Sequence, residues 1–168
     1  MARTYKLGPL RKAVNSVVAA LLKAGTGPKS TYLLTTTGRR SGLPRTTPVT
    51  LMEDETGRWL VAPYGNVSWV HNVRSSRAVE LSRGRRRERL SAEEVNATAA
   101  GPVLRRYLRS LPVTRPYFDV RPDDPETAFA AEAARHPVFR LTAANQDSLW
   151  LAGRGEIAAH NPRRGRLP

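Results

Sequence analysis

The residues best suited to binding chemistry lie in one short cationic stretch, GRRSGLPR at positions 38–45. It places Arg39, Arg40 and Arg45 around Ser41 and two glycines. Guanidinium groups bind phosphate and carboxylate oxygens in pairs, and backbone N–H groups of a tight turn add further donors. The stretch therefore predicts a receptacle for a phosphate or a carboxylate. A solvated basic hairpin tip is the alternative, because charged turns are commonly exposed to water.

Two β-rich segments flank this turn and would position it. Leu33 to Thr37 and Thr46 to Leu51 are rich in β-branched and apolar residues, which favours a hairpin. Further strands are expected at Arg58 to Ala62, Arg77 to Ser82, Arg85 to Leu90 and Val138 to Leu141. The pattern predicts a mostly antiparallel sheet of about six strands.

An amphipathic helix is expected before the first strand. Apolar residues recur at three- and four-residue spacing between Leu7 and Leu22, which predicts a helix over residues 7–24 that ends at Gly25. Such a helix can cover the open end of the β-core. The alternative is a basic helix that lies on an anionic membrane surface.

Shorter helices are expected between and after the strands. Ser68 is predicted to cap a helix that carries Trp69 and Asn72 on one face. A capping box formed by Ser91 and Glu94 predicts another helical region. That region is expected to be interrupted at Gly101 and Pro102, and a last helix is expected from Pro125 to Arg135.

The composition is typical of one folded domain with a strong positive charge. The 168 residues include 28 Lys and Arg, 14 Asp and Glu and no cysteine, so the formal net charge is +14. A single domain is expected over residues 1–144, followed by a flexible C-terminal tail at 145–168. The charge favours an anionic partner, and the lack of cysteine excludes disulfides and thiolate sites. Neither a membrane-spanning run nor a signal peptide is recognised, so a cytoplasmic location is expected.

Several kinds of chemistry find no support in the sequence. His71, His136 and His160 are scattered, so no metal site is expected. Neither a serine nucleophile elbow nor a dinucleotide-binding glycine motif occurs, so an enzyme of this sequence would need an external cofactor. Arginines at positions 83–89 could follow a nucleic-acid backbone or protect an edge strand. Because aromatics make up only 7% of the chain and no nucleic-acid fold signature is found, no nucleic-acid partner is expected.

Three motifs follow one another at compatible spacing: GRRSGLPRTTPV (38–49), LVAPYG (60–65) and SWVHNVR (68–74). Together they resemble the deazaflavin-dependent nitroreductase family, the branch of split β-barrel flavoproteins that uses coenzyme F420. The likeness runs from Tyr32 to Leu141. It implies an α+β split β-barrel with an N-terminal amphipathic helix and additional short helices, and F420 rather than FMN as the coenzyme.

The resemblance also implies a set of cofactor-binding residues. The cationic turn and the strand after it would hold the phosphate and oligoglutamate side, the third strand and its loop would lie along the deazaflavin ring, and the W-x-x-N helix would complete the site. The residues implied are Arg39, Arg40, Ser41, Arg45, Thr46, Thr47, Pro48, Val49, Thr50, Val61, Ala62, Pro63, Tyr64, Gly65, Ser68, Trp69, Val70, His71 and Asn72.

The function implied is an F420H2-dependent reductase that passes a hydride to a hydrophobic, electron-poor acceptor such as an enone, a quinone or a nitro compound. Tyr64 and Tyr117 are the candidate catalytic residues, because a tyrosine hydroxyl can donate the accompanying proton. A carrier that binds F420 or another anionic cofactor without turnover is the alternative. The sequence is compatible with a monomer or a homodimer, and with peripheral membrane contact through the N-terminal helix.

Overall fold

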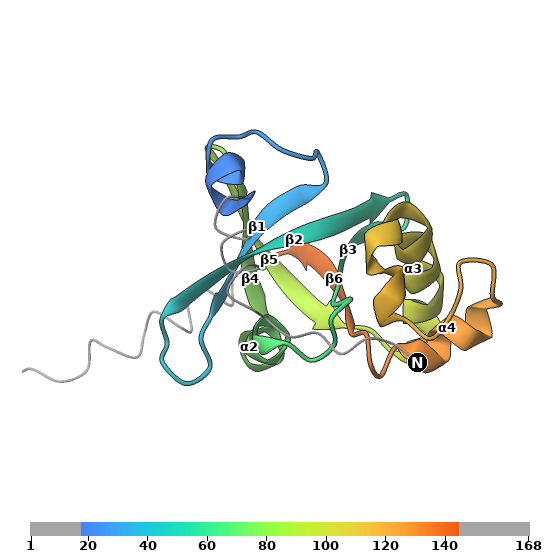
Figure 1. The fold of residues 1–168 in the computed structure, drawn as a ribbon. Coiled ribbons are helices and arrows are strands. Elements are labelled where there is room, and N and C mark those ends of the chain that lie inside the picture. The colour runs from blue at the N-terminus through green and yellow to red at the C-terminus, as the bar shows by residue number, and fades with distance from the viewer. Residues whose placement is uncertain (1–17, 145–168) are drawn as a thin grey trace, which may run out of the picture.

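The computed structural model describes residues 18–144, which form a closed, six-stranded antiparallel β-barrel with helices outside it (Figure 1). The strands follow one another around the barrel in the order β1-β2-β3-β6-β5-β4. The elements are β1 (Thr31–Thr37), β2 (Pro44–Asp54), β3 (Gly57–Val61), α2 (Ser68–Ser76), β4 (Ala78–Arg83), β5 (Arg86–Glu94), α3 (Ala97–Ser110), the 3-10 helix η1 (Pro112–Tyr117), α4 (Glu126–Glu132) and β6 (Val138–Ala143). The predicted α+β fold with about six antiparallel strands is confirmed.

Alternating side chains of the strands fill the barrel interior. Leu34 and Leu60 are fully buried there, and Phe139 of β6 and Val70 of α2 pack into the same cluster. Successive residues of a strand point to opposite faces, so every second position enters the core. Burial of each such side chain stabilises the fold by roughly 1.5–3 kcal/mol.

A second hydrophobic core lies outside the barrel, beneath α3, η1 and α4. Trp59 and Val61 of β3 point into it, away from the interior position of Leu60 between them. Tyr107 of α3 and Phe129 of α4 meet them there. Strand β3 is covered on both faces, which explains its continuous apolar sequence. Helices α3 and α4 lie side by side on one flank of the barrel (Figure 1).

Barrel closure removes the edge strand that the arginine-rich hairpin was expected to provide. Strand β4 pairs with β1, and β5 pairs with β6, so both strands of this hairpin have partners on either side. Gly84 turns the hairpin with φ +57° and donates its N–H to the carbonyl of Leu22 at 2.7 Å. Residues 18–23 are helical, with Leu22 buried. The rest of the helix predicted at 7–24 and the tail predicted at 145–168 lie outside the described residues.

The capping box predicted at Ser91 and Glu94 is wrong. Both residues belong to β5, where Leu90 and Ala92 alternate into the barrel core. Helix α3 begins later, at Ala97, and Asn96 is its N-cap, because the Asn96 side chain accepts a hydrogen bond from the Ala99 N–H at 2.9 Å. The alternating burial of the strand outweighed a local capping pattern.

The predicted interruption at Gly101 and Pro102 is also wrong, because α3 runs through both residues. Pro102 forgoes one intrahelical hydrogen bond, a cost offset by the apolar face that α3 buries. At Gly101 a Cβ atom would come within 3.0 Å of the Glu126 carbonyl oxygen. The glycine therefore lets α4 approach α3 closely rather than ending the helix.

The predicted cap of α2 is displaced by one residue. Val67 occupies the N-cap position with extended backbone, and Ser68 is the first helical residue, with no side-chain capping bond. The helix itself, with Trp69 and Asn72, is where the sequence predicted it. Within the part of the chain that the structure describes, no helix has the length and apolar character needed to cross a membrane.

A buried amide fixes α2 to the first hairpin. The Oδ1 atom of Asn72 accepts a hydrogen bond from the backbone N–H of Arg39 at 3.2 Å, and its Nδ2 donates to Thr36 Oγ1 at 3.1 Å. Asn72 and Thr36 are almost fully buried. The helix and the turn that follows β1 are therefore held in one fixed relation.

We expect Asn72→Ala to lower the free energy of unfolding by about 1–3 kcal/mol, because it leaves a buried hydroxyl and a backbone N–H without their amide partner. Urea denaturation monitored by tryptophan fluorescence measures the change. Asn66→Ala is the matched control, since Asn66 is exposed and should cost no more than about 0.5 kcal/mol. Equal effects of the two substitutions would contradict a bracing role for Asn72.

Candidate cofactor and acceptor site

The cationic turn between β1 and β2 is tightly built. Gly38 donates its N–H to the Leu43 carbonyl at 2.9 Å, and Gly42 donates to the Gly38 carbonyl at 2.7 Å. Gly42 has φ +66°, a conformation that favours glycine. A Cβ atom on Gly38 would lie 2.8 Å from Ser41 Oγ, which itself accepts from the Leu43 N–H. Both glycines are therefore needed for this turn to form.

Three guanidinium groups gather around this turn without carboxylate partners. Arg39, Arg40 and Arg45 are exposed, and no Asp or Glu among residues 18–144 pairs with their side chains. Elsewhere arginines do find carboxylates, as Arg74 does with Glu94 at 2.6 Å. The turn thus combines backbone rigidity with uncompensated positive charge, as a site for a polyanion requires.

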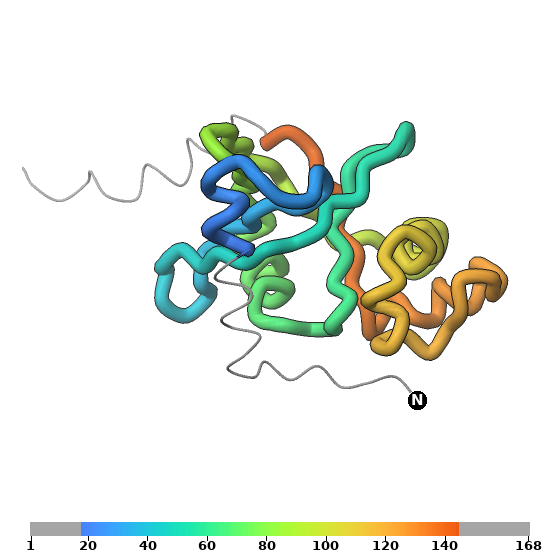
Figure 2. Tube along the Cα trace, turned by 45° about the horizontal axis from the view of Figure 1, so that its top comes forward, coloured from blue at the N-terminus to red at the C-terminus, as the bar shows by residue number. Residues whose placement is uncertain are grey.

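Strand β2 leads from this turn toward α3. Figures 1 and 2 both show the turn projecting on the side of the barrel away from α3 and α4. The residues implied for the cofactor on this strand, Thr46 to Thr50, are exposed to half-buried. Thr46 Oγ1 lies 2.9 Å from Thr35 Oγ1 of β1, so the two strands share a hydroxyl contact beside the turn. The strand offers a continuous track from the cationic turn to the helices.

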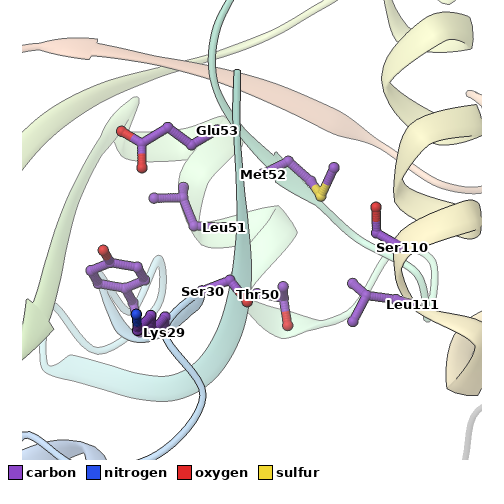
Figure 3. A pocket seen from close by; sticks show the side chains of 9 residues that line it. Lys29, Ser30, Thr50, Leu51, Met52, Glu53, Ser110 and Leu111 are labelled. Atoms are coloured by element: carbon purple, nitrogen blue, oxygen red, sulfur yellow. The ribbon is translucent and has the colours of Figure 1, made fainter. Parts of the chain in front are cut away.

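A hollow of about 390 Å³ lies where β2 nears the end of α3. Figure 3 shows Met52 extending from β2 toward Ser110 and Leu111 of the α3 terminus. Lys29 borders it on the other side (Figure 3), and Tyr32 also lines it. The hollow therefore has an apolar wall and a charged rim. It lies at the end of β2 opposite to the cationic turn.

Most side chains at the end of β3 and in the loop that follows it are shielded from solvent. Val61, Ala62 and Pro63 are buried, with Val61 in the core beneath α3. Tyr64 is 36% exposed, and Gly65 turns the chain with φ +81°. A ligand along this segment would meet backbone and the Tyr64 ring, while the preceding side chains hold the segment in place.

The helix α2 contributes mainly support. Val70 is fully buried in the barrel core, and Asn72 binds the cationic turn. Trp69 packs half-buried against the core, with its ring 5.8 Å from that of Phe139. Ser68 is exposed and His71 is half-buried. Of the residues implied on this helix, Ser68 is therefore the most accessible to a ligand.

The two candidate catalytic tyrosines are brought together although they are far apart in the sequence. The rings of Tyr64 and Tyr117 meet edge to face, with centroids 4.8 Å apart. Tyr64 comes from the loop after β3, and Tyr117 from the end of η1. The 3-10 helix η1 packs against α3, which lies on the side of the barrel away from the projecting cationic turn (Figure 1).

A third tyrosine joins this group, although no motif in the sequence marks it as functional. Tyr107 of α3 is almost fully buried, and burial together with the neighbouring Tyr64 raises the pKa of its hydroxyl. It therefore stays neutral in ordinary buffers and can donate a hydrogen bond. The sequence signal that could have singled it out is a residue with a polar end at a position that a helix buries.

Comparisons with known proteins agree with this architecture. A solved structure described as an F420-H2 dependent reductase (FDR-A) superposes with a TM-score of 0.50 at 21% identity, covering 68% of this chain and 95% of its own. Another, described as a domain-swapped dimer, gives 0.52 at 20% identity and covers 80% of this chain and 100% of its own. At these identities the likeness shows a shared fold. No curated protein matches the chain.

The sequence pattern of one family covers most of the barrel and its helices. It matches residues 11–127, which is more than half of the chain and includes the cationic turn, the W-x-x-N helix and all three tyrosines of the group. The chain belongs to the F420H(2)-dependent quinone reductase family.

Proposed function

We propose that this protein is an F420H2-dependent reductase that transfers a hydride to an electron-poor small molecule, a quinone, an enone or a nitro compound. The observation that carries the proposal is the rigid turn with three arginines that have no carboxylate partner among the described residues. Family membership supports the same cofactor. Together they account for the uncompensated positive charge of this turn.

The residues present fit a long, anionic cofactor of this kind. Arg39, Arg40 and Arg45 would hold its phosphate and carboxylate groups, because charge-assisted bonds to guanidinium are among the strongest that a surface can offer. The outer side of β2 and the backbone at Ala62 to Gly65 would support the ring. When bound in its reduced form, F420 would supply the hydride.

The protein itself would orient the acceptor and supply a proton. Met52, Leu111 and Tyr117 are half-buried at the margin of the core beneath α3, where they offer an apolar wall to a planar acceptor. Tyr64 and Tyr117, whose rings meet edge to face, would donate a proton to the reduced acceptor through their hydroxyl groups. Alignment of the reactants and exclusion of water are the main contributions of the chain.

We expect Arg40→Ala to weaken F420 binding by about 1.5–3 kcal/mol, or roughly tenfold to hundredfold, because it removes a charge-assisted bond to the anionic tail. A fluorescence titration at low and raised salt measures the loss, which salt should reduce.

Arg86→Ala is the matched control for this substitution. It removes the same charge from an exposed residue at the start of β5, beside the Gly84 turn that contacts residue Leu22. Its F420 affinity should stay within about twofold of wild type, because the Gly84 turn lies beside the first residues of β1, whereas the cationic turn follows its last residue, and the charge is screened. If both variants lose affinity equally, the first turn is only a solvated hairpin tip.

We expect Tyr117→Ala to lower the turnover of F420H2 with menadione or a cyclic enone by at least about tenfold, because it removes both the wall and a proton donor. The F420 affinity should change little, since the cationic turn lies on the other side of the barrel. Anaerobic loss of F420H2 absorbance measures turnover. Tyr117→Phe separates the contribution of the hydroxyl from that of the ring.

Two results would count against this assignment. Full activity of Tyr117→Ala would remove that residue from the acceptor site. Tight F420 binding with no oxidation of F420H2 by any acceptor of a broad panel would favour a carrier and reject the reductase.

A further inference from the structure

A cluster of charged and titratable groups is buried where α4 leads into β6. Glu132 and His136 are 2% and 4% exposed, and His136 Nε2 lies 3.2 Å from Glu132 Oε2. Arg135, between them in the sequence, pairs with Glu132 and with Asp119. The imidazole of His136 stacks on the ring of Phe118, with centroids 3.8 Å apart and planes inclined by 20°.

Burial of these polar and charged groups is unfavourable in free energy. Burial lowers the pKa of His136 to about 4 and raises the pKa of Glu132, although Arg135 opposes the rise. His136 is therefore neutral at physiological pH, and its Nε2 faces the carboxylate of Glu132 at 3.2 Å. Well-packed apolar residues are often as stabilising as a buried ionic group, or more so. A role beyond packing would explain why polar groups occupy this position.

The cluster contacts both chain segments that carry the candidate tyrosines. The backbone N–H of Ala62, two residues before Tyr64, donates to the carbonyl of Pro137, the residue after His136, at 2.9 Å, and Phe118, the residue after Tyr117, stacks on the His136 imidazole. On the next residue after Tyr64, a Cβ atom at Gly65 would lie 3.3 Å from the carbonyl oxygen of Arg135. The loop after β3 and the end of η1 therefore both lie against the segment that carries His136.

We propose that Glu132 and His136 are positioning residues that hold Tyr64 and Tyr117 in their edge-to-face contact. The Glu132 carboxylate, 3.2 Å from Nε2, limits the positions open to the imidazole, and the imidazole supports the segment that carries Tyr117 by stacking on Phe118. The contribution of Glu132 and His136 to catalysis rests on the proposed reductase function. Their effect on the contact between Tyr64 and Tyr117 is independent of that function. Small displacements of groups around reactants can cost about a hundredfold in rate, so such a support would matter to turnover.

The test uses the full chain with 3-fluorotyrosine at position 117 and follows its fluorine NMR signal. His136→Phe keeps an aromatic ring against Phe118 but removes the nitrogen that meets Glu132. His136→Gln restores an amide donor and serves as the conservative rescue, and Glu132→Gln keeps the shape of the carboxylate without its charge. Val103→Ala is the control for simple destabilisation. Val103 is buried in the same hydrophobic core as Phe118, and its side chain forms no hydrogen bond with the cluster.

We expect His136→Phe and Glu132→Gln to shift or broaden the fluorine signal, and Val103→Ala to leave it in place. The same two variants should lower kcat for F420H2 oxidation by about tenfold or more, with the KM for F420H2 within about twofold of wild type, while His136→Gln recovers most of the rate. An unchanged signal in folded His136→Phe or Glu132→Gln would overturn the proposal. If His136→Phe does not fold, Glu132→Gln decides the matter alone.

The fluorine and kinetic readouts separate this proposal from the reductase assignment. A shifted signal in the variants supports the positioning of Tyr117 whether or not the wild type oxidises F420H2. A wild-type protein that shows no oxidation rejects the reductase function on its own. A signal that moves while kcat of an active enzyme stays unchanged would overturn the claim that the pair supports catalysis.

Discussion

The buried amide of Asn72 is the interaction on which the candidate site depends most. Three like charges near one turn repel one another, and an unbraced hairpin tip would let Arg39, Arg40 and Arg45 separate. The bond from the Arg39 N–H to Asn72 Oδ1 joins this turn to α2, whose Val70 and Val73 are sealed in the barrel core. A receptor that is already ordered loses less entropy on binding than one that must first be ordered. The W-x-x-N pattern thus acts here as a brace.

Each of the two hydrophobic cores positions a different part of the candidate site. The barrel interior fixes β1, β2 and α2, and with them the cationic turn. The outer core fixes α3, η1 and α4, and with them the tyrosines. Strand β3 belongs to both, because Leu60 points inward while Trp59 and Val61 point outward. Strands β3 and β2 therefore hold the cationic turn at a fixed separation from the apolar surface beneath α3.

Much of this could be predicted from the sequence where the pattern was local. The strands, the glycine turns and the helix with Trp69 and Asn72 follow from β-branched runs and chain breakers. The errors arose where tertiary burial decided: Ser91 and Glu94 resemble a cap but lie on a strand that closes the barrel, and Gly101 looks like a breaker but admits α4. The meeting of Tyr64, Tyr107 and Tyr117 depends on how distant segments pack, which no spacing in the sequence encodes.

The proposed function requires that the cationic turn select a cofactor with a long anionic tail. A pair of fluorescence titrations of the purified protein, one with F420 and one with FMN at the same ionic strength, measures this selection. We expect F420 to bind more tightly, because its oligoglutamate tail adds carboxylates for Arg39, Arg40 and Arg45 that FMN lacks. Equal or tighter binding of FMN would show that the turn does not select the tail.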